Sequence, residues 1–258
     1  MKLVKTLAIG AGVATLIFAA AFIDRRVALQ ATPPPHAITN EGFALIELFT
    51  SEGCSSCPAA DKLLAQIREA AGDKPVYVLA YHIDYWDHLG WKDLFSNPEY
   101  SKRQRQYSAW LCTEQIYTPQ VVVNGKTECV GSNEAEVKER ISQALNTPAA
   151  SSLSLQAKPQ GQKVVIDYRA AGQATDSRLL IAMVQKHAVR KIQRGENGGR
   201  TLEHTSIVRD LHSFKAEPHG SHELSLPEGF NPQDWEIMGM LQRSKNGEII
   251  AAARVAFQ

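Results

Sequence analysis

The stretch ELFTSEGCSSCPAADKLL, residues 47–64, places two cysteines two positions apart between two different sequence patterns. Before them, the apolar run FALIELF at 43–49 has the length and composition of a buried strand. After them, apolar residues recur every three or four positions until Gly72, as in a helix that ends at a glycine. Cys54 and Cys57 therefore lie at a strand-to-helix junction. The spacing alone leaves three interpretations open: a redox pair, half of a metal site, or a structural crosslink.

The segments that follow continue the alternation of strands and helices. We predict, in chain order, a strand at 76–83, an aromatic-rich loop at 84–98, a helix at 99–111, a hairpin at 118–131 and a helix capped by Asn133. The Asn124-Gly125 pair predicts a two-residue hairpin turn, which would place Cys129 opposite Gln120.

The order strand, CxxC, helix, strand, helix, hairpin, helix resembles the thioredoxin fold over residues 43–147. The Thr118-Pro119 step strengthens this resemblance, which implies a cis proline beside the cysteines and a Thr118 backbone free to pair with an extended substrate. The segments SEGCSSCPAAD, YHIDYWDHLGWKD, YTPQVVVNG and RGENGGRTLEHTSIVR are similar to the exported, thioredoxin-like domain-of-unknown-function 1223 family. That similarity covers most of the mature chain. It implies a fold and a CxxC, but no established substrate.

From Ser151 the sequence changes to short, often alternating apolar runs separated by turn residues. Seven such runs predict an antiparallel β-sandwich. The predicted fold class is therefore an α/β thioredoxin-like fold at 42–148, a central mixed sheet flanked by helices, followed by an all-β sandwich domain at 149–258. We expect the second domain to present a partner or to cover one face of the first.

The segment RGENGGR at 194–200 contains glycines, but their spacing is not that of a dinucleotide-binding loop. Arg194 and Arg200, with His204 beyond them, are either solvated loop residues or a polar patch. We favour the solvated loop, because exposed charges usually face water and contribute little to stability.

The spacing of Cys54 and Cys57 suits thiol–disulfide exchange, because sulfurs two residues apart can meet across one helical turn. The attacking species in this reaction is a thiolate. Unpaired N–H groups at a helix N-terminus favour that charged form. We predict that Cys54, just outside the first turn, is the exposed attacking cysteine and that Cys57 is shielded and resolves the mixed disulfide.

Polar residues near the strand ends are candidates for supporting the cysteines. In thioredoxins a buried acid on the strand before CxxC helps move the proton of the resolving cysteine. By this resemblance Glu47 is either such an acid or a residue that strand alternation turns to the surface. His82 and Asp84 follow the apolar core of the second strand, at the end where sites form in open α/β sheets. His82 either stabilises a thiolate or is an ordinary hydrogen-bonded histidine; Trp86 and Trp91 are expected to pack over the sheet.

Cys112 and Cys129 are predicted to form a structural disulfide, because exported proteins favour disulfides. In the chain-entropy model a loop of this size contributes about 3 kcal/mol. A second redox pair is one alternative. A four-cysteine zinc site is another, but structural zinc sites usually use two close pairs, and these cysteines are 17 positions apart. We therefore predict no metal ion.

The N-terminus predicts export. A short lysine-containing segment precedes an uncharged run at 6–23, which has the pattern of a signal peptide and nearly the length of a membrane anchor. We assign residues 1–30 to one of these and the proline-rich residues 31–41 to a spacer. The protein is therefore expected in the periplasm or outside the cell, or anchored in the inner membrane.

These observations predict an exported thiol–disulfide oxidoreductase that uses Cys54 and Cys57 on protein or small-molecule thiols and disulfides. We expect a redox partner protein, no cofactor, and membrane contact only through an uncleaved N-terminal anchor. The alternative is a non-catalytic thioredoxin-like binding or scaffold protein of the cell envelope. The formal net charge of +1 and the lack of a basic cluster give no sign of a nucleic-acid surface.

Overall fold

The computed structural model describes residues 41–257, which belong to one compact unit. The predicted signal peptide or anchor at 1–30 and the spacer up to residue 40 lie outside the described residues. The elements are β1 (Ala44–Thr50), α1 (Cys57–Ala71), β2 (Val76–His82), α2 (Pro98–Leu111), β3 (Gln120–Val123), β4 (Thr127–Val130), α3 (Glu134–Leu145), β5 (Ser151–Gln160), β6 (Lys163–Gly172), β7 (Ser177–Lys191), β8 (Thr201–Lys215), β9 (His219–Ser225), β10 (Trp235–Arg243) and β11 (Ile249–Ala256), with a short 3₁₀ turn at Pro232–Asp234. None of the helices in this part of the chain is both long enough and apolar enough to cross a membrane.

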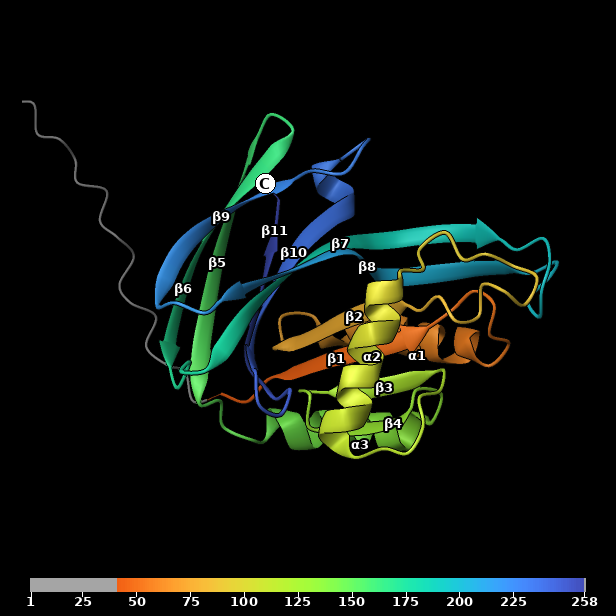
Figure 1. Cartoon of the computed structure of the whole chain (residues 1–258), viewed down its shortest axis with the longest axis horizontal. Helices are drawn as coiled ribbons and strands as arrows, with labels where there is room; N and C mark the ends of the chain where they lie inside the picture. Colours follow the sequence, from red (N-terminus) through yellow and green to blue (C-terminus); the bar gives the residue numbers. More distant parts are fainter. Residues whose placement is uncertain (1–40, 258) are drawn as a thin grey trace, which may run out of the picture. The chain divides into compact units, whose positions relative to one another are not determined.

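Eight strands form a central sheet in the order β11-β10-β7-β8-β2-β1-β3-β4 (Figure 1). β1 and β2 are parallel, and β2 is also parallel to β8 through the pair Ala80 and Ile207. All other neighbours in this sheet are antiparallel. The expectation of a central mixed sheet with flanking helices is confirmed, and the sheet is larger than residues 42–148 alone could form.

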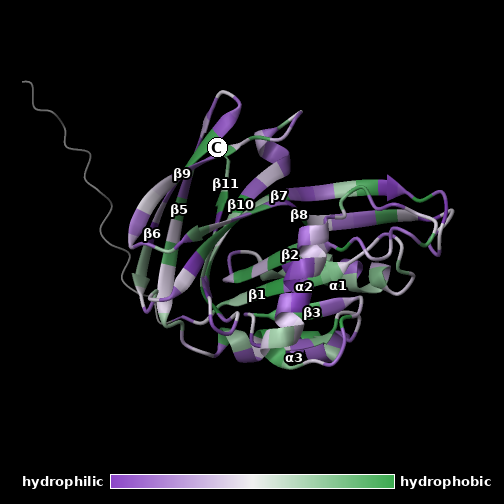
Figure 2. Cartoon of the chain, viewed as in Figure 1, coloured by the Kyte–Doolittle hydropathy of each residue, from purple (hydrophilic) through white to green (hydrophobic). Residues whose placement is uncertain are grey.

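Strand alternation gives the two faces of this sheet different partners. On β1, Leu45 and Phe49 point to the face covered by α2, where they share a hydrophobic cluster with Tyr107. Ile46 and Leu48 point to the opposite face, which α1 and α3 cover. We call these the α2 face and the α1 face. Figure 2 shows mainly hydrophobic residues along β1 and β2, whereas α2 and the outer strands β6 and β9 carry many hydrophilic ones.

The helix ends follow local capping chemistry. The Asn97 side chain accepts a hydrogen bond of 2.9 Å from the Glu99 N–H at the start of α2. Asn133 caps α3 as predicted, accepting from the Glu136 N–H. Gly72 ends α1 with φ 54°, a conformation that glycine adopts without steric cost. These short-range signals explain why the helices could be predicted from the sequence.

The predicted all-β sandwich is only partly present, because the strands beyond residue 149 divide between two sheets. β7, β8, β10 and β11 extend the central sheet, while β5, β6 and β9 form a second, three-stranded sheet. The second sheet packs on the α1 face of the extension, where Ile166 meets Ile181 and Ile237 in one hydrophobic cluster. The extension has a physical cause: β8 pairs with the edge of β2 that would otherwise expose unpaired backbone groups.

The hairpin between β3 and β4 differs from the prediction by one residue. Val123 pairs with Thr127, so three residues form the turn and Cys129 lies opposite Val121 rather than Gln120. Asn124 takes part in tertiary hydrogen bonds: its amide oxygen accepts from the Leu45 N–H at 2.7 Å. This link ties the turn to β1, a contact that the local Asn-Gly preference does not include.

Candidate functional site

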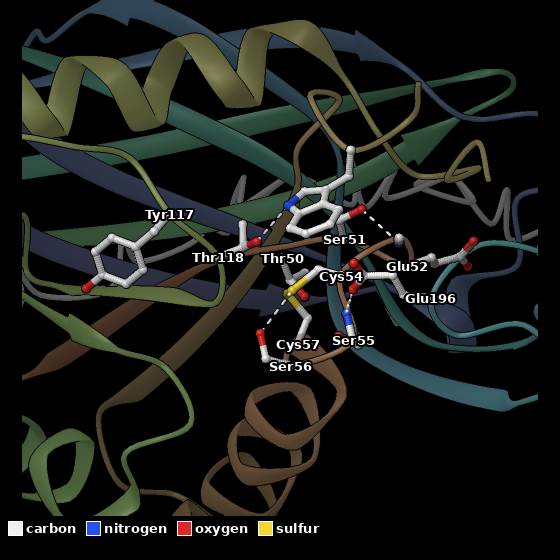
Figure 3. Close-up of a disulfide and its surroundings, with 12 residues drawn as sticks. Thr50, Ser51, Glu52, Cys54, Ser55, Ser56, Cys57, Tyr117, Thr118 and Glu196 are labelled. Carbon is white, nitrogen blue, oxygen red and sulfur yellow. Dashed lines mark hydrogen bonds between the residues drawn. A yellow bond between two sulfur atoms is a disulfide. The ribbon is translucent and has the colours of Figure 1, made fainter. Parts of the chain in front are cut away.

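Cys54 and Cys57 form a disulfide at the carboxyl end of β1, with their Cα atoms 5.4 Å apart (Figure 3). α1 begins at Cys57 itself, and its first turn contains no acidic residue. The turn at 51–56 is held by its own backbone: the Cys54 N–H donates to the Ser51 carbonyl at 3.2 Å, and the Cys57 N–H donates to the Cys54 carbonyl at 3.3 Å. The Ser56 hydroxyl lies 3.3 Å from Cys54 Sγ. The disulfide thus lies at the positive end of α1.

The prediction that Cys54 is exposed is wrong for this conformation, because Cys54 is 1% exposed and Cys57 is 0% exposed. The loop between β7 and β8 covers this region. The Asn197 amide donates to the carbonyls of Glu52 and Cys54, at 2.9 Å each. Glu196 accepts from the Ser55 N–H at 2.9 Å, as Figure 3 shows.

The segment RGENGGR is therefore a cover over the CxxC turn rather than a freely solvated loop. Asn197 is fully buried, and Arg200 Nη1 donates to its side-chain oxygen at 2.7 Å. Arg194 and Arg200 are exposed, whereas His204 is buried in β8. These three residues consequently do not form one polar patch.

Thr118 and Pro119 directly precede β3, and Thr118 is linked to the CxxC turn through Trp86. The bond between Thr118 and Pro119 is cis, as the resemblance implied. Trp86 spans this region: its indole N–H donates to Thr118 Oγ1 at 2.8 Å, and its Cβ lies beside Gly53, where an added Cβ would be 3.1 Å away. Trp86 therefore links the CxxC turn to the segment before β3, and its contacts go beyond simple packing over the sheet.

Glu47 is fully buried, but it lies on the α2 face, opposite α1. Its carboxylate accepts from Arg103 Nε at 2.8 Å and Nη2 at 2.7 Å, and it also accepts from the Tyr107 hydroxyl. Gln242 completes this group: its oxygen accepts from Arg103 Nη1 at 3.2 Å, and its amide donates to Tyr107 at 2.9 Å. We call Glu47, Arg103, Tyr107 and Gln242 the α2-face cluster. The expectation of a surface residue is wrong, because α2 covers Glu47. The expectation of a buried acid holds, but strand alternation places this acid on the face opposite α1.

Asp84 also forms its hydrogen bonds with a residue of α2 and not with the CxxC turn. Its carboxylate accepts from the Ser101 hydroxyl on α2, and its N–H donates to the same oxygen at 3.1 Å. This placement ties the start of the aromatic-rich loop to α2.

His82 lies on the α1 face, at the end of β2, and is fully buried. Its Nδ1 is 2.7 Å from Asp93 Oδ2. Burial alone would lower the pKa of His82, but the charge of Asp93 and the hydrogen bond to it raise this pKa above its ordinary value. The same contact lowers the pKa of Asp93, against the effect of burial.

A second buried histidine, His204 on β8, packs against His82 with 4.9 Å between ring centroids. His204 Nε2 is 3.4 Å from Glu52 Oε1, and Glu52 also accepts from Trp91 Nε1 at 2.7 Å. Among residues 41–257, His82 Nε2 and both ring nitrogens of His204 have no hydrogen-bond partner. The site therefore contains imidazole nitrogens that are buried but not committed to a fixed bond.

Asp61 on α1 completes this group. It is 7% exposed, and its Oδ2 accepts from the Thr50 hydroxyl at 3.0 Å. Burial raises the pKa of Asp61, although His204, His82 and the Thr50 hydrogen bond pull it down. We call Glu52, Asp61, His82, Asp93 and His204 the α1-face cluster.

The predicted disulfide between Cys112 and Cys129 is not formed, and both thiols are free. Cys129 is buried in the hydrophobic cluster of the α1 face, and burial raises its pKa to about 11. Cys112 is exposed at the end of α2, which packs on the opposite face through Trp110 and Leu111. The central sheet therefore separates the two sulfurs.

The four-cysteine zinc arrangement is likewise not formed, since Cys54 and Cys57 are bonded to each other. No group of three or more histidine, cysteine, aspartate or glutamate side chains within residues 41–257 is arranged to hold a metal ion.

Sequence reasoning missed Asp61, Asp93, Glu52 and Asn197. Asp61 had a usable signal, because Cys57, Ala60, Asp61 and Leu64 share one helical face that is otherwise apolar. An acid on such a face is either paired or functional. Asn197 had no comparable signal, because its partners are more than 140 positions away in sequence.

The fold and the site together define a class of protein: α/β proteins that carry a CxxC disulfide where a strand of a mixed sheet leads into a helix. The chain belongs to the family described as Protein of unknown function (DUF1223), whose model matches residues 45–242. The resemblance stated from the sequence is thus confirmed at the level of this family. No curated protein matches the chain.

Two solved structures are similar to this chain. A structural-genomics protein of Agrobacterium tumefaciens has 23% identity and a TM-score of 0.65, covering 84% of this chain and 96% of its own. HBP35 of Porphyromonas gingivalis has 16% identity and a TM-score of 0.60, covering 86% of this chain and 77% of its own. At these identities the similarity concerns the fold alone.

Proposed function

We propose that this protein is an exported thiol–disulfide oxidoreductase whose residues 42–148 form a thioredoxin-like unit. One observation carries the proposal: the Cys54–Cys57 disulfide lies where α1 begins, at a helix end whose first turn holds no acid. Such a position favours a thiolate, the species that exchanges disulfides. The placement of Thr118 near the CxxC turn, through Trp86, supports it further.

In the proposed reaction a substrate thiolate attacks Cys54 Sγ and the Cys54–Cys57 bond breaks. The electron pair of that bond goes to Cys57 Sγ, which becomes a thiolate and takes up a proton. A second substrate thiolate then attacks the substrate sulfur of the mixed disulfide and releases Cys54 as a thiolate. Two substrate thiols are thereby oxidised to a disulfide, and the cysteine pair is reduced; the reverse sequence reduces a substrate disulfide.

The proposal requires the β7–β8 loop to move, because an attacking sulfur cannot reach a residue that is 1% exposed. Asn197 and Glu196 join the loop to the CxxC turn through three hydrogen bonds, of which the two from Asn197 are buried and the one to Glu196 is exposed. None of them belongs to the strand pairing, so opening of the loop does not require unfolding of the sheet. Exported protein thiols and small thiols are the substrates we propose, together with a redox partner protein that restores the starting state.

The test is turnover of a glutathione-type disulfide and of a reduced, unfolded protein by the purified protein. We expect Cys54→Ser to abolish turnover and Cys57→Ser to trap a mixed disulfide on Cys54. Cys112→Ser is the matched control, because it removes an exposed free thiol and should leave turnover unchanged. Turnover that persists in Cys54→Ser would refute the proposal.

The burial of both cysteines favours a second candidate, a binding or scaffold protein in which this disulfide is a structural crosslink. Structural disulfides resist reduction by the glutathione pool, whereas catalytic ones exchange readily. Equilibration with glutathione buffers separates the two. A disulfide that stays fully oxidised at reducing ratios would support the scaffold, and one that titrates within the physiological range would support the enzyme.

A further inference from the structure

Asp61 and Cys57 lie on the same side of α1. They are four positions apart, the spacing that places side chains one above the other at about 5–6 Å between Cβ atoms. Cys57 is 0% exposed and Asp61 is 7% exposed. The resolving cysteine is therefore sealed from water, and a buried carboxyl group is the nearest acid on its own helix.

The proton that Cys57 gains or loses during exchange must come from somewhere inside the fold. Glu47 cannot supply it, because it lies on the other face of the sheet and its carboxylate is bonded to Arg103 and Tyr107. Within residues 41–257, Asp61 has a single side-chain hydrogen bond, from the Thr50 hydroxyl. Burial raises its pKa, so its protonated form is easier to reach than that of a solvated aspartate.

A chain of buried titratable groups leads from Asp61 toward the surface. Thr50, whose hydroxyl donates to Asp61 at 3.0 Å, is paired in register with His82 on the neighbouring strand β2. The ring of His82 in turn lies 4.9 Å from that of His204. His204 Nε2 reaches Glu52 at 3.4 Å. Glu52 is itself buried, but it contacts Arg190, whose side chain is 31% exposed, so this end of the cluster adjoins solvent.

The structure assigns a proton-transfer function: we propose that Asp61 donates to and accepts from Cys57, and that the His82–His204 pair and Glu52 exchange this proton with solvent. The inference rests on the proposed oxidoreductase function. When the Cys54–Cys57 bond breaks, Cys57 Sγ takes the proton of Asp61 and leaves a carboxylate. A proton from solvent then restores Asp61 through the histidines. In the opposite direction Asp61 removes the proton from Cys57 before its sulfur attacks the mixed disulfide.

The groups that face Asp61 come from several elements and all enter its pH dependence. Thr50 on β1 donates to it, and His82 on β2 and His204 on β8 carry positive charge when protonated. Asp93 acts in the opposite sense, because its negative charge raises the pKa of Asp61. The pH profile therefore reports the whole α1-face cluster, with Asp61 as the group next to Cys57.

The experiment follows the ionisation of the Cys57 thiol by thiolate absorbance in the ultraviolet, in a protein that carries both Cys54→Ser and Cys112→Ser. Cys129 is then the other free thiol, and its pKa, raised to about 11 by burial, separates its titration from that of Cys57. A negative Asp61 opposes the Cys57 thiolate, so Asp61→Asn should shift the titration midpoint down by about one to two pH units. Glu69→Gln is the matched control, since it removes an exposed carboxylate from the same helix and should shift nothing. Circular dichroism verifies that each variant is folded.

A second, kinetic experiment tests whether Asp61 transfers a proton, rather than only the effect of its charge. In the protein with both cysteines, Asp61→Asn should remove one limb of the pH–rate profile of disulfide exchange, and Asp61→Glu should restore part of it. Thr50→Val should move that limb to higher pH, because it removes a hydrogen bond to the carboxylate. An unchanged midpoint and profile in Asp61→Asn, while Cys54→Ser still abolishes turnover, would overturn this inference and leave the oxidoreductase proposal intact. Turnover that survives Cys54→Ser would overturn both.

Discussion

Both faces of the central sheet bury charged side chains beside β1, but the hydrogen bonding of these side chains differs between the two faces. In the α2-face cluster every guanidinium nitrogen of Arg103 has a partner, and the Glu47 carboxylate accepts from both Arg103 and Tyr107. In the α1-face cluster, within the part of the chain that the structure describes, three imidazole nitrogens of His82 and His204 make no hydrogen bond, although His204 Nε2 lies 3.4 Å from Glu52 Oε1.

This difference separates two uses of a buried charge. A buried ion pair whose hydrogen bonds are satisfied holds elements together, here β1, α2 and β10, and has no proton to give at neutral pH. Groups with free proton sites and pKa values displaced by their neighbours are instead able to exchange protons. The CxxC disulfide lies on the α1 face, beside the second kind of cluster.

The largest expected effect comes from breaking the α2-face cluster. Arg103→Met leaves the Glu47 carboxylate buried without its cation, and both side chains are at most 6% exposed. We expect the free energy of unfolding to fall by about 3–5 kcal/mol. Urea denaturation of the oxidised protein, monitored by circular dichroism, measures this loss.

The matched control is Lys138→Met on α3, which removes one partner of an exposed ion pair with Glu134. That change should cost no more than about 1 kcal/mol. A double variant, Glu47→Leu with Arg103→Met, should recover part of the loss because no charge is then left unpaired. If Arg103→Met costs as little as Lys138→Met, the α2-face cluster is not the structural element described above.

A smaller, pH-dependent effect is expected in the α1-face cluster. Asp93→Asn removes the charge that raises the pKa of His82, and with it a buried hydrogen bond that contributes about 1.5–3 kcal/mol. The raised pKa of His82 contributes stability below its unfolded value near 6.5, and this contribution is lost as pH rises through the folded pKa. The lowered pKa of Asp93 contributes stability above its unfolded value near 3.9, and this is lost as pH falls through the folded pKa.

Both contributions are therefore complete between about pH 4 and 6.5. The difference in unfolding free energy between the wild-type protein and Asp93→Asn should be larger at pH 5.5 than at pH 8.5. Asp84→Asn, at the start of the same loop and bonded to Ser101 on α2 rather than to a histidine, should show no such pH dependence. A difference for Asp93→Asn that grows toward alkaline pH would contradict the assignment.

The elements set by local patterns were predictable from the sequence. The strand, CxxC and helix order around Cys54 and the cap at Asn133 depend on residues within a few positions of one another. The face on which Glu47 lies was not predictable, because both faces of β1 are buried and an acid on either one breaks an apolar pattern. Only the packing of α2 decides between them.

The assembly of the site depends on contacts between distant segments. His204 reaches His82 only because β8 pairs with β2, and that pairing rests on one registered residue pair, Ala80 with Ile207. The alternating runs beyond residue 149 predicted strands correctly but carried no information on which sheet each strand joins. For the same reason the sequence identified Asn197 and Glu196 only as loop residues and did not indicate that their loop covers the CxxC turn.

The smallest effect is expected at the solvent end of the α1 face. The Glu196 carboxylate binds the Ser55 N–H, so a negative charge already occupies the helix end that would stabilise a Cys54 thiolate. Glu196→Gln keeps an acceptor oxygen and removes the charge. In the reduced protein the alkylation rate of Cys54 near neutral pH should rise about two- to five-fold at low ionic strength.

Salt dependence distinguishes this charge effect from a loosening of the loop. An electrostatic gain should shrink as ionic strength rises, because Glu196 is exposed and screened. Glu139→Gln on the exposed side of α3 makes the same change in net charge and should leave the rate unchanged. A gain that persists at high salt would mean that Glu196 acts by holding the loop closed, and the helix end would then have no measurable part in preparing Cys54 for attack.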